Sequence, residues 1–141
     1  MNKVITTALV LTAGITFFSF KQSASTRNNV ATGKEIYEAQ CMSCHMDQGQ
    51  GLEGVYPPLA KSDYLADKDR LVKVIRKGMR GPITVNGVQY DGEMTGFELT
   101  DQETADVINY IRTSWGNKHA AVKAADVPAA LNKASKDYQP Y

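Results

Sequence analysis

Cys41-Met42-Ser43-Cys44-His45 is the stretch of sequence that decides the fold of this chain. The two cysteines stand three positions apart, and they are the only cysteines among the 141 residues. Two residues so close together cannot staple distant parts of a chain, so a disulfide-scaffolded fold is excluded. The pair must therefore act on each other or on a bound group, with the adjacent histidine as its partner.

The order Cys-x-x-Cys-His is the attachment signature of c-type haem. The two thiols add to the two vinyl groups of one porphyrin, and the next residue places its imidazole where it can bind the iron. A thioredoxin-like pair is the first alternative, but such pairs lie near a βαβ pattern, and here a helix is expected before the motif. A zinc site would need four ligands, and a plain disulfide would leave His45 without a role. We therefore expect one covalently bound haem, attached at Cys41 and Cys44, with His45 as an iron ligand.

The sixth position of the iron needs a ligand from elsewhere in the chain. Met79, Met94 and His119 are the candidates, because Met42 and Met46 are tied to the side of His45. Met94 stands in a glycine-flanked loop that could wrap over a porphyrin, whereas Met79 directly follows a helix and is expected to fill the core. We expect Met94 to be the distal ligand. A His/Met pair raises the reduction potential and closes both faces of the iron, which suits electron transfer.

The N-terminus has the pattern of a secretory signal peptide. Lys3 precedes an uncharged run, Val4–Phe20, and a small polar stretch follows Lys21. Residues 1–25 are predicted to be a signal peptide that is cleaved after Ala24 or Ser25, so the protein is expected in the periplasm. The alternative is an uncleaved anchor that keeps the protein on the membrane and facing the periplasm, since the run is at the lower limit of a spanning helix.

The overall composition is that of one ordinary globular domain, with 43% hydrophobic and 22% charged residues. A disordered chain, a collagen and a multi-span membrane protein are thereby excluded. The net charge of +1 gives no argument for nucleic-acid binding. The predicted domain organisation is a signal peptide at 1–25, one domain at 26–117 and a tail at 118–141.

Capping and turn residues predict the elements of the domain. Thr32 and Glu35 form a capping-box pattern before a helix over 33–40, and Thr100 and Glu103 form another before a helix over 100–115. Between them we expect a helix over 67–77, a small hairpin over 83–90 around Asn86-Gly87, and a loop over 91–97. The tail is expected to be a loose helix or partly disordered.

These residues resemble the class I cytochrome c family over Thr32–Trp115. Gly33, Tyr37 and Cys41 are similar to the glycine, aromatic and cysteine pattern of the family's first helix. The resemblance implies that His45 is the proximal ligand and Met94 the distal ligand. In Pro57-Pro58-Leu59 it implies a family Pro-x-Leu that lines the haem, with the Pro57 carbonyl accepting a hydrogen bond from His45. The family's aromatic residue in the last helix, which packs near the glycine of the first, corresponds to Tyr110. Thr95 departs from the pattern, because many members have proline after the distal methionine.

The resemblance implies an all-α cytochrome c domain with three main helices around one haem and a small hairpin-like loop before Met94. It also implies a mono-haem carrier that passes single electrons between respiratory partners and is not itself an enzyme. Terminal oxidases, copper nitrite reductases and quinoprotein dehydrogenases are the expected partners. The alternatives are a haem subunit held in a larger oxidoreductase and a haem protein whose labile sixth position binds a small ligand.

A cluster of basic residues stands on and after the second predicted helix. It is either a solvated helix face or a docking patch for an acidic redox partner. Its members are Lys68, Arg70, Lys73, Arg76, Lys77 and Arg80.

Overall fold

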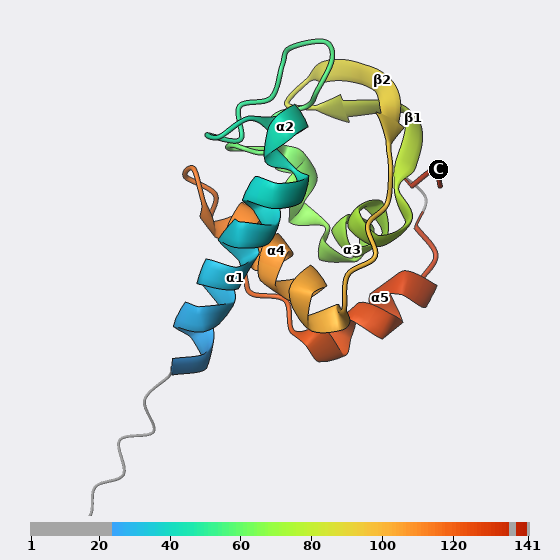
Figure 1. The fold of residues 1–141 in the computed structure, drawn as a ribbon. Helices are drawn as coiled ribbons and strands as arrows, with labels where there is room; N and C mark the ends of the chain where they lie inside the picture. Colours follow the sequence, from blue (N-terminus) through green and yellow to red (C-terminus); the bar gives the residue numbers. More distant parts are fainter. Residues whose placement is uncertain (1–23, 136–137, 141) are drawn as a thin grey trace, which may run out of the picture.

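The computed structural model describes residues 24–135 and 138–140, and it combines a group of packed helices with one two-stranded hairpin (Figure 1). The predicted signal segment lies outside these residues except for its last two positions. In the described part, no helix is long and apolar enough to cross a membrane. The elements are α1 (Ala24–Gln40), α2 (Met42–His45), η1 (Asp63–Ala66), α3 (Lys68–Lys77), β1 (Met79–Val85), β2 (Val88–Met94), α4 (Asp101–Thr113), η2 (Ala124–Asp126) and α5 (Val127–Asn132).

The all-α expectation is wrong, because β1 and β2 form an antiparallel sheet. The turn is the predicted one: Asn86 and Gly87 have φ of 50° and 82°, which a two-residue type I′ hairpin turn requires. The side chain of Asn86 also accepts a hydrogen bond from the Asp63 amide at 3.0 Å. The ladder continues from Val85↔Val88 to Met79↔Met94, so residues 91–94, expected as a loop, are strand.

The first helix begins at Ala24, eight residues before the expected cap at Thr32. The capping-box prediction there is wrong, and Thr32 lies within α1. The segment between Ala24 and Thr32 contains no glycine or proline that would end a helix, so the helical conformation extends through it.

The other two predicted caps are confirmed. The Asp67 carboxylate accepts hydrogen bonds from the Asp69 and Arg70 amides at the start of α3. Thr100 and Glu103 form a capping box with both of its hydrogen bonds at the start of α4. The last of these helices ends at Thr113 rather than at Trp115, because Ser114 is already extended.

α1 and α4 pack closely at Gly33. A Cβ at this position would collide with the Asp106 carbonyl oxygen and lie 3.0 Å from the Tyr110 Cβ. The expected contact between the first-helix glycine and Tyr110 is therefore present. One turn further on, the Tyr37 ring lies 5.5 Å from that of Tyr110 and 4.9 Å from that of Trp115, between centroids. This contact fixes the end of α1, and with it the start of the Cys-x-x-Cys-His motif.

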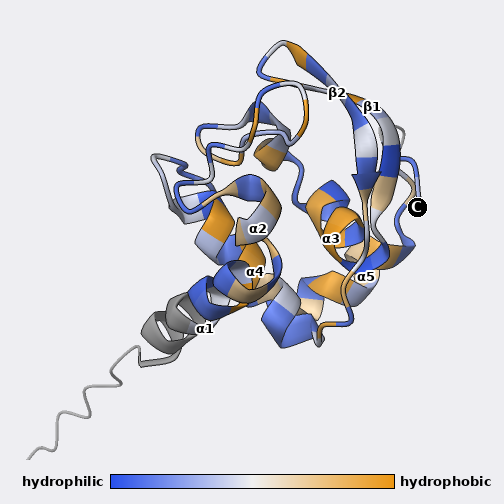
Figure 2. Ribbon diagram, turned by 45° about the horizontal axis from the view of Figure 1, so that its top comes forward, coloured by the Kyte–Doolittle hydropathy of each residue, from blue (hydrophilic) through white to orange (hydrophobic). Residues whose placement is uncertain are grey.

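The tail is ordered against the domain over most of its described length. In Figure 2, α3, α4 and α5 each carry orange apolar residues beside blue polar ones, as amphipathic helices do. Val127 and Ala130 of the tail are buried in the same core as Leu71 and Ile108 of α3 and α4.

This docking changes the interpretation of the basic cluster, because most of its members have partners within the chain. Lys73 is buried and donates a hydrogen bond to the Lys133 carbonyl oxygen. Lys77 donates to the Leu131 carbonyl oxygen, and Arg76 pairs with Asp101 at 3.0 Å. Lys73 and Lys77 are therefore bonded to the tail and Arg76 to α4, so these three side chains do not form a free docking patch.

Candidate functional site

The proximal side of the site is built where α1 passes into α2. Cys41 joins the two helices, and the amide of His45 donates a hydrogen bond to its carbonyl oxygen at 2.9 Å. Cys41 and His45 are each 9% exposed, and Cys44 is more open. This tight turn places His45 between two adjoining pockets, one of which also touches Cys41 and the other Cys44.

The orientation of His45 is set by a loop that follows the motif. The His45 Nδ1 lies 2.9 Å from the Pro57 carbonyl oxygen, which can only accept, so Nδ1 carries the proton and donates. The Nε2 atom is then left as the lone-pair donor for a metal. Burial lowers the pKa of His45, and the hydrogen bond to Pro57 opposes this effect. Burial dominates, so the imidazole is kept in the neutral form that binds iron.

The loop itself is held at two points. The Leu59 amide donates to the Gly49 carbonyl oxygen at 2.7 Å, and the buried Asn117 side chain donates to the Leu59 carbonyl oxygen at 2.8 Å. The other hydrogen bond of the Asn117 amide goes to the Ile111 carbonyl oxygen at the end of α4, also at 2.8 Å. Asn117 thus ties the loop that orients His45 to the last helix, a role that no sequence motif indicated.

The environment of the cysteines argues against a thioredoxin-like pair. Burial, and to a smaller extent the nearby Cys44, raises the pKa of the Cys41 thiol to about 11. Reactive dithiols have a lowered pKa, because the thiolate is the nucleophile. Cys41 is the opposite case.

Across the cavity from the motif lie the two methionines of the hairpin. Met79 and Met94 are directly paired across β1 and β2, and both line the same cavities as His45. Met79 is 7% exposed and Met94 is half-buried. His119 lines none of these cavities.

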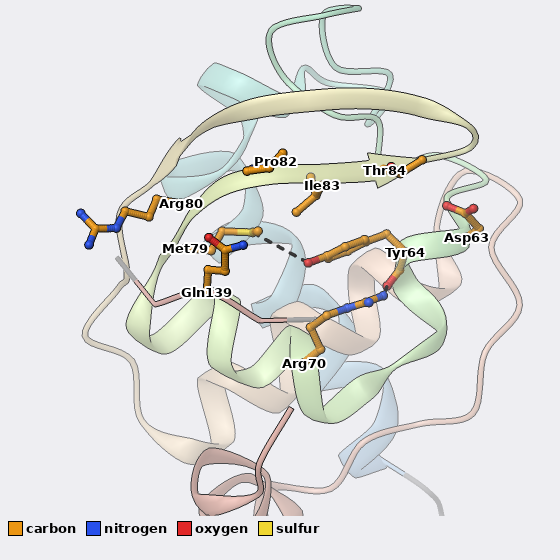
Figure 3. A pocket seen from close by; sticks show the side chains of 9 residues that line it. All are labelled: Asp63, Tyr64, Arg70, Met79, Arg80, Pro82, Ile83, Thr84 and Gln139. Carbon is orange, nitrogen blue, oxygen red and sulfur yellow. Dashed lines mark hydrogen bonds between the residues drawn. The ribbon is translucent and has the colours of Figure 1, made fainter. Parts of the chain in front are cut away.

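Three adjoining pockets of about 480, 70 and 410 Å³ all touch Met79 and Ile83. Together they lie in the size range of roughly 300–1,000 Å³ that is typical of cofactor sites. Figure 3 shows the largest, with Tyr64, Arg70 and Met79 pointing into it. The cavity against Cys41 and His45 is lined almost wholly by apolar side chains, Leu59 among them.

Two observations on the polar atoms of the lining agree with a bound haem. Ser62 Oγ and Arg70 Nε are buried without a hydrogen-bond partner, and both residues line the cavities. Buried polar atoms almost always have a hydrogen-bond partner, and the carboxylates of a haem would accept hydrogen bonds from these two groups. Sequence reasoning did not single out Ser62, and it considered Arg70 only as part of the basic cluster.

A paired-cysteine turn, an imidazole held by a proline carbonyl and an apolar cavity with thioether side chains define a small domain built to hold a covalently attached haem. The cytochrome c family matches residues 30–115 of the chain. Cytochrome c-552 of Thermus thermophilus is 43% identical over 93 residues, which cover 62% of this chain and 70% of that protein.

Two further relatives are parts of larger enzymes. The cytochrome c subunit of the quinone alcohol dehydrogenase of Gluconobacter oxydans (strain 621H) is 38% identical over 100 residues, or 67% of this chain and 21% of that subunit. The cbb3-type cytochrome c oxidase subunit CcoP of Azospirillum sp. (strain B510) is 35% identical over 71 residues, or 45% of this chain and 24% of that subunit. The chain therefore spans only about a quarter or less of these two subunits.

The chain belongs to the cytochrome c family. It is a class I c-type cytochrome, which binds one haem c covalently and transfers single electrons.

Proposed function

We propose that the haem is attached through Cys41 and Cys44 and that its iron is bound by His45 and Met94. Pro57 orients the proximal imidazole, and Leu59 packs beside it in the apolar cavity. The observation that carries this proposal is a pair of adjoining pockets, which share His45, Met79 and Met94. One of these pockets reaches Cys41 and the other reaches Cys44.

The haem supplies a one-electron couple between ferric and ferrous iron, and the chain tunes and shields it. His45 donates through Nε2, because its other nitrogen is engaged by Pro57. A thioether at the sixth position favours the ferrous state and raises the reduction potential. The apolar lining excludes water, so little rearrangement accompanies the change of charge.

This proposal also covers the setting of the protein. Residues 1–25 direct export and are removed, and the mature domain works in the periplasm as part of a respiratory chain. It is a carrier and not an enzyme, and its partners are of the kind represented by terminal oxidases, copper nitrite reductases and quinoprotein dehydrogenases. Relatives that are named as subunits of a dehydrogenase and of an oxidase support redox enzymes as partners. They also keep open the alternative of a subunit held within one complex.

The exposed residues around the pocket that reaches Cys44 favour an apolar and basic partner, whereas the basic cluster suggested an acidic one. Val55 is 55% exposed and Tyr56 is 37% exposed, and both line the cavity that also touches Cys44. Asp91 and Glu93 on β2 line the same cavity and are exposed. We therefore expect the partner to present apolar side chains with basic ones beside them. Added salt should slow electron transfer to such a partner, because it screens this attraction.

The first test is an absorption spectrum of the exported protein, ferric and then reduced. We expect c-type haem bands and the weak long-wavelength methionine-to-iron band of the ferric form. The band should persist in Met79→Leu, and carbon monoxide should not readily shift the reduced spectrum. A ready carbon monoxide shift without the methionine band would favour the ligand-binding alternative. No haem, in cells that mature c-type cytochromes, would refute the site. The mass of the mature protein tests removal of residues 1–25.

A further inference from the structure

We propose that Met79 is a second thioether ligand, which takes the sixth position of the iron whenever Met94 leaves it. This inference rests on the proposed function, in which Met94 is the usual distal ligand. It concerns a residue that sequence reasoning assigned to core packing.

The first argument is the strand register. Met79 and Met94 are the last directly opposed pair of the hairpin. Side chains of a directly opposed antiparallel pair extend from the same face of the sheet, with Cβ atoms about 4.5–5.5 Å apart. The side chains of Met79 and Met94 therefore start from adjacent positions and extend from the same face of the hairpin.

The second argument is that both side chains border the space that His45 borders. Met79 and Met94 line the apolar cavity together with Cys41 and His45, and they also line the neighbouring cavity that reaches Cys44. Met42, by contrast, is exposed on α2, within the attachment motif itself. Met79 is thus the second methionine of the described residues that lies across the cavity from the proximal histidine.

The third argument is the way in which Met79 is held. It is buried, and the Tyr64 hydroxyl donates a long hydrogen bond to its sulfur at 4.0 Å, which Figure 3 draws as a dashed line. This contact is weak, so it places the thioether without binding it firmly. Three rotatable bonds let a methionine side chain change its reach at little cost. Soft thioether sulfur is moreover a ligand type that haem iron accepts beside histidine.

Three variants test the proposal: Met94→Leu, Met79→Leu and the double variant. Leucine keeps the volume, since Leu and Met are well-tolerated exchanges in a core, and the covalent link retains the haem. Met42→Leu is the matched control, because it removes a methionine within the attachment motif. Far-ultraviolet circular dichroism verifies that each variant is folded.

We expect Met94→Leu to keep a methionine-to-iron band in the ferric form and the double variant to lose it. Met42→Leu should leave the band unchanged. In a titration with imidazole, the double variant should bind at least about tenfold more tightly than Met94→Leu, because no internal ligand competes there. The double variant should also have a lower reduction potential than Met94→Leu.

Loss of the band in Met94→Leu alone, or equal imidazole affinity in Met94→Leu and the double variant, would overturn the reserve role of Met79 and leave Met94 as the distal ligand. The reserve role would also fail if the methionine-to-iron band were lost in Met79→Leu and kept in Met94→Leu. Met79 would then be the usual ligand, and the proposed assignment of Met94 would fail with it. The carrier function is tested separately, by the haem spectrum and the reversible one-electron response.

Discussion

The Nδ1 atom of His45 donates a hydrogen bond of 2.9 Å to the carbonyl oxygen of Pro57, twelve residues further along the chain. The bond fixes the tautomer and the plane of the ring. It also makes the imidazole a stronger electron donor through Nε2, because the Nδ1 proton is partly drawn toward the carbonyl. In the proposed haem site, stronger donation would stabilise ferric iron, so this contact should lower the reduction potential and partly offset the effect of a methionine ligand.

Replacing Pro57 should therefore raise the potential. Pro57→Ala keeps the carbonyl but releases the fixed φ of the ring, so the acceptor is held less firmly. We expect the midpoint potential to rise by roughly 20–60 mV, where about 60 mV is a tenfold change for one electron. A redox titration measures this change. The control is Pro58→Ala, which relaxes the same loop one residue away from the acceptor. An equal rise in both variants would mean that loop flexibility, not the hydrogen bond, sets the potential.

The contact between α1 and α4 depends on the absence of a side chain at Gly33. Gly33→Ala improves helix propensity, but the added methyl group would meet the Asp106 carbonyl and force the helices apart. We expect a loss of about 1–3 kcal/mol in the free energy of unfolding, as overpacking usually costs. Chemical denaturation measures it, with Lys34→Ala as the control at an exposed position of the same helix. If Gly33→Ala is as stable as the wild type, the helices do not meet as described.

Local signals predicted the parts of the fold that depend on a few neighbouring residues. The caps at Asp67 and Thr100 and the turn at Asn86-Gly87 are confirmed, because each needs only its own side chains or its own positive φ. The length of the hairpin was underestimated. Pro82, Gly92 and Asp91 are of types that strands usually avoid, yet the ladder runs through all three. The all-α class was implied by the family resemblance, and the longer hairpin corrects it.

In the candidate site, too, the features set by neighbouring residues were predicted and those set by distant residues were not. The placing of the motif residues against a cavity followed from the Cys-x-x-Cys-His pattern, and their roles as ligands stay predictions. Asn117, the orphaned Ser62 hydroxyl and the docking of the tail on α3 join residues that lie far apart in the sequence. Nothing in the local sequence around any of them marks the contact. Similarly, the basic cluster could not be interpreted without knowing that Lys73 and Lys77 bond to the tail.

Asp106 is a buried acid whose charge costs stability at neutral pH. Burial is the main cause that raises its pKa, and nearby Glu103 adds to it, while a hydrogen bond from Gln102 at 2.8 Å opposes them. Asparagine can accept the same hydrogen bond without the charge. We expect Asp106→Asn to stabilise the protein by about 1 kcal/mol at pH 7.

The pH dependence of the stability difference tests whether the buried charge of Asp106 is its cause. An acid whose pKa is raised in the folded state binds its proton more tightly there than in the unfolded chain. Its destabilising effect is full above the folded pKa and vanishes as the pH falls to the unfolded value. Thermal melts of wild type and Asp106→Asn should therefore converge on acidification. A gap that is constant with pH, or a less stable variant, would contradict this account of Asp106.

Asn117 should be among the polar residues that matter most for the proximal loop. It is 6% exposed, and its amide donates to the carbonyl oxygens of Leu59 and Ile111. Asn117→Ala would leave both acceptors unpaired in a buried place, and each such loss costs about 1–3 kcal/mol. We expect a fall in the free energy of unfolding within or above that range, measured by urea titration. Asn132→Ala is the matched control, because its amide donates to Pro128 on the exposed surface.

The Asn117 variant should also broaden the proton resonances of His45, since the loop that carries Pro57 is no longer tied to α4. Equal stability of the two variants would show that the loop does not depend on Asn117 and that its bonds to His45 and Gly49 are sufficient.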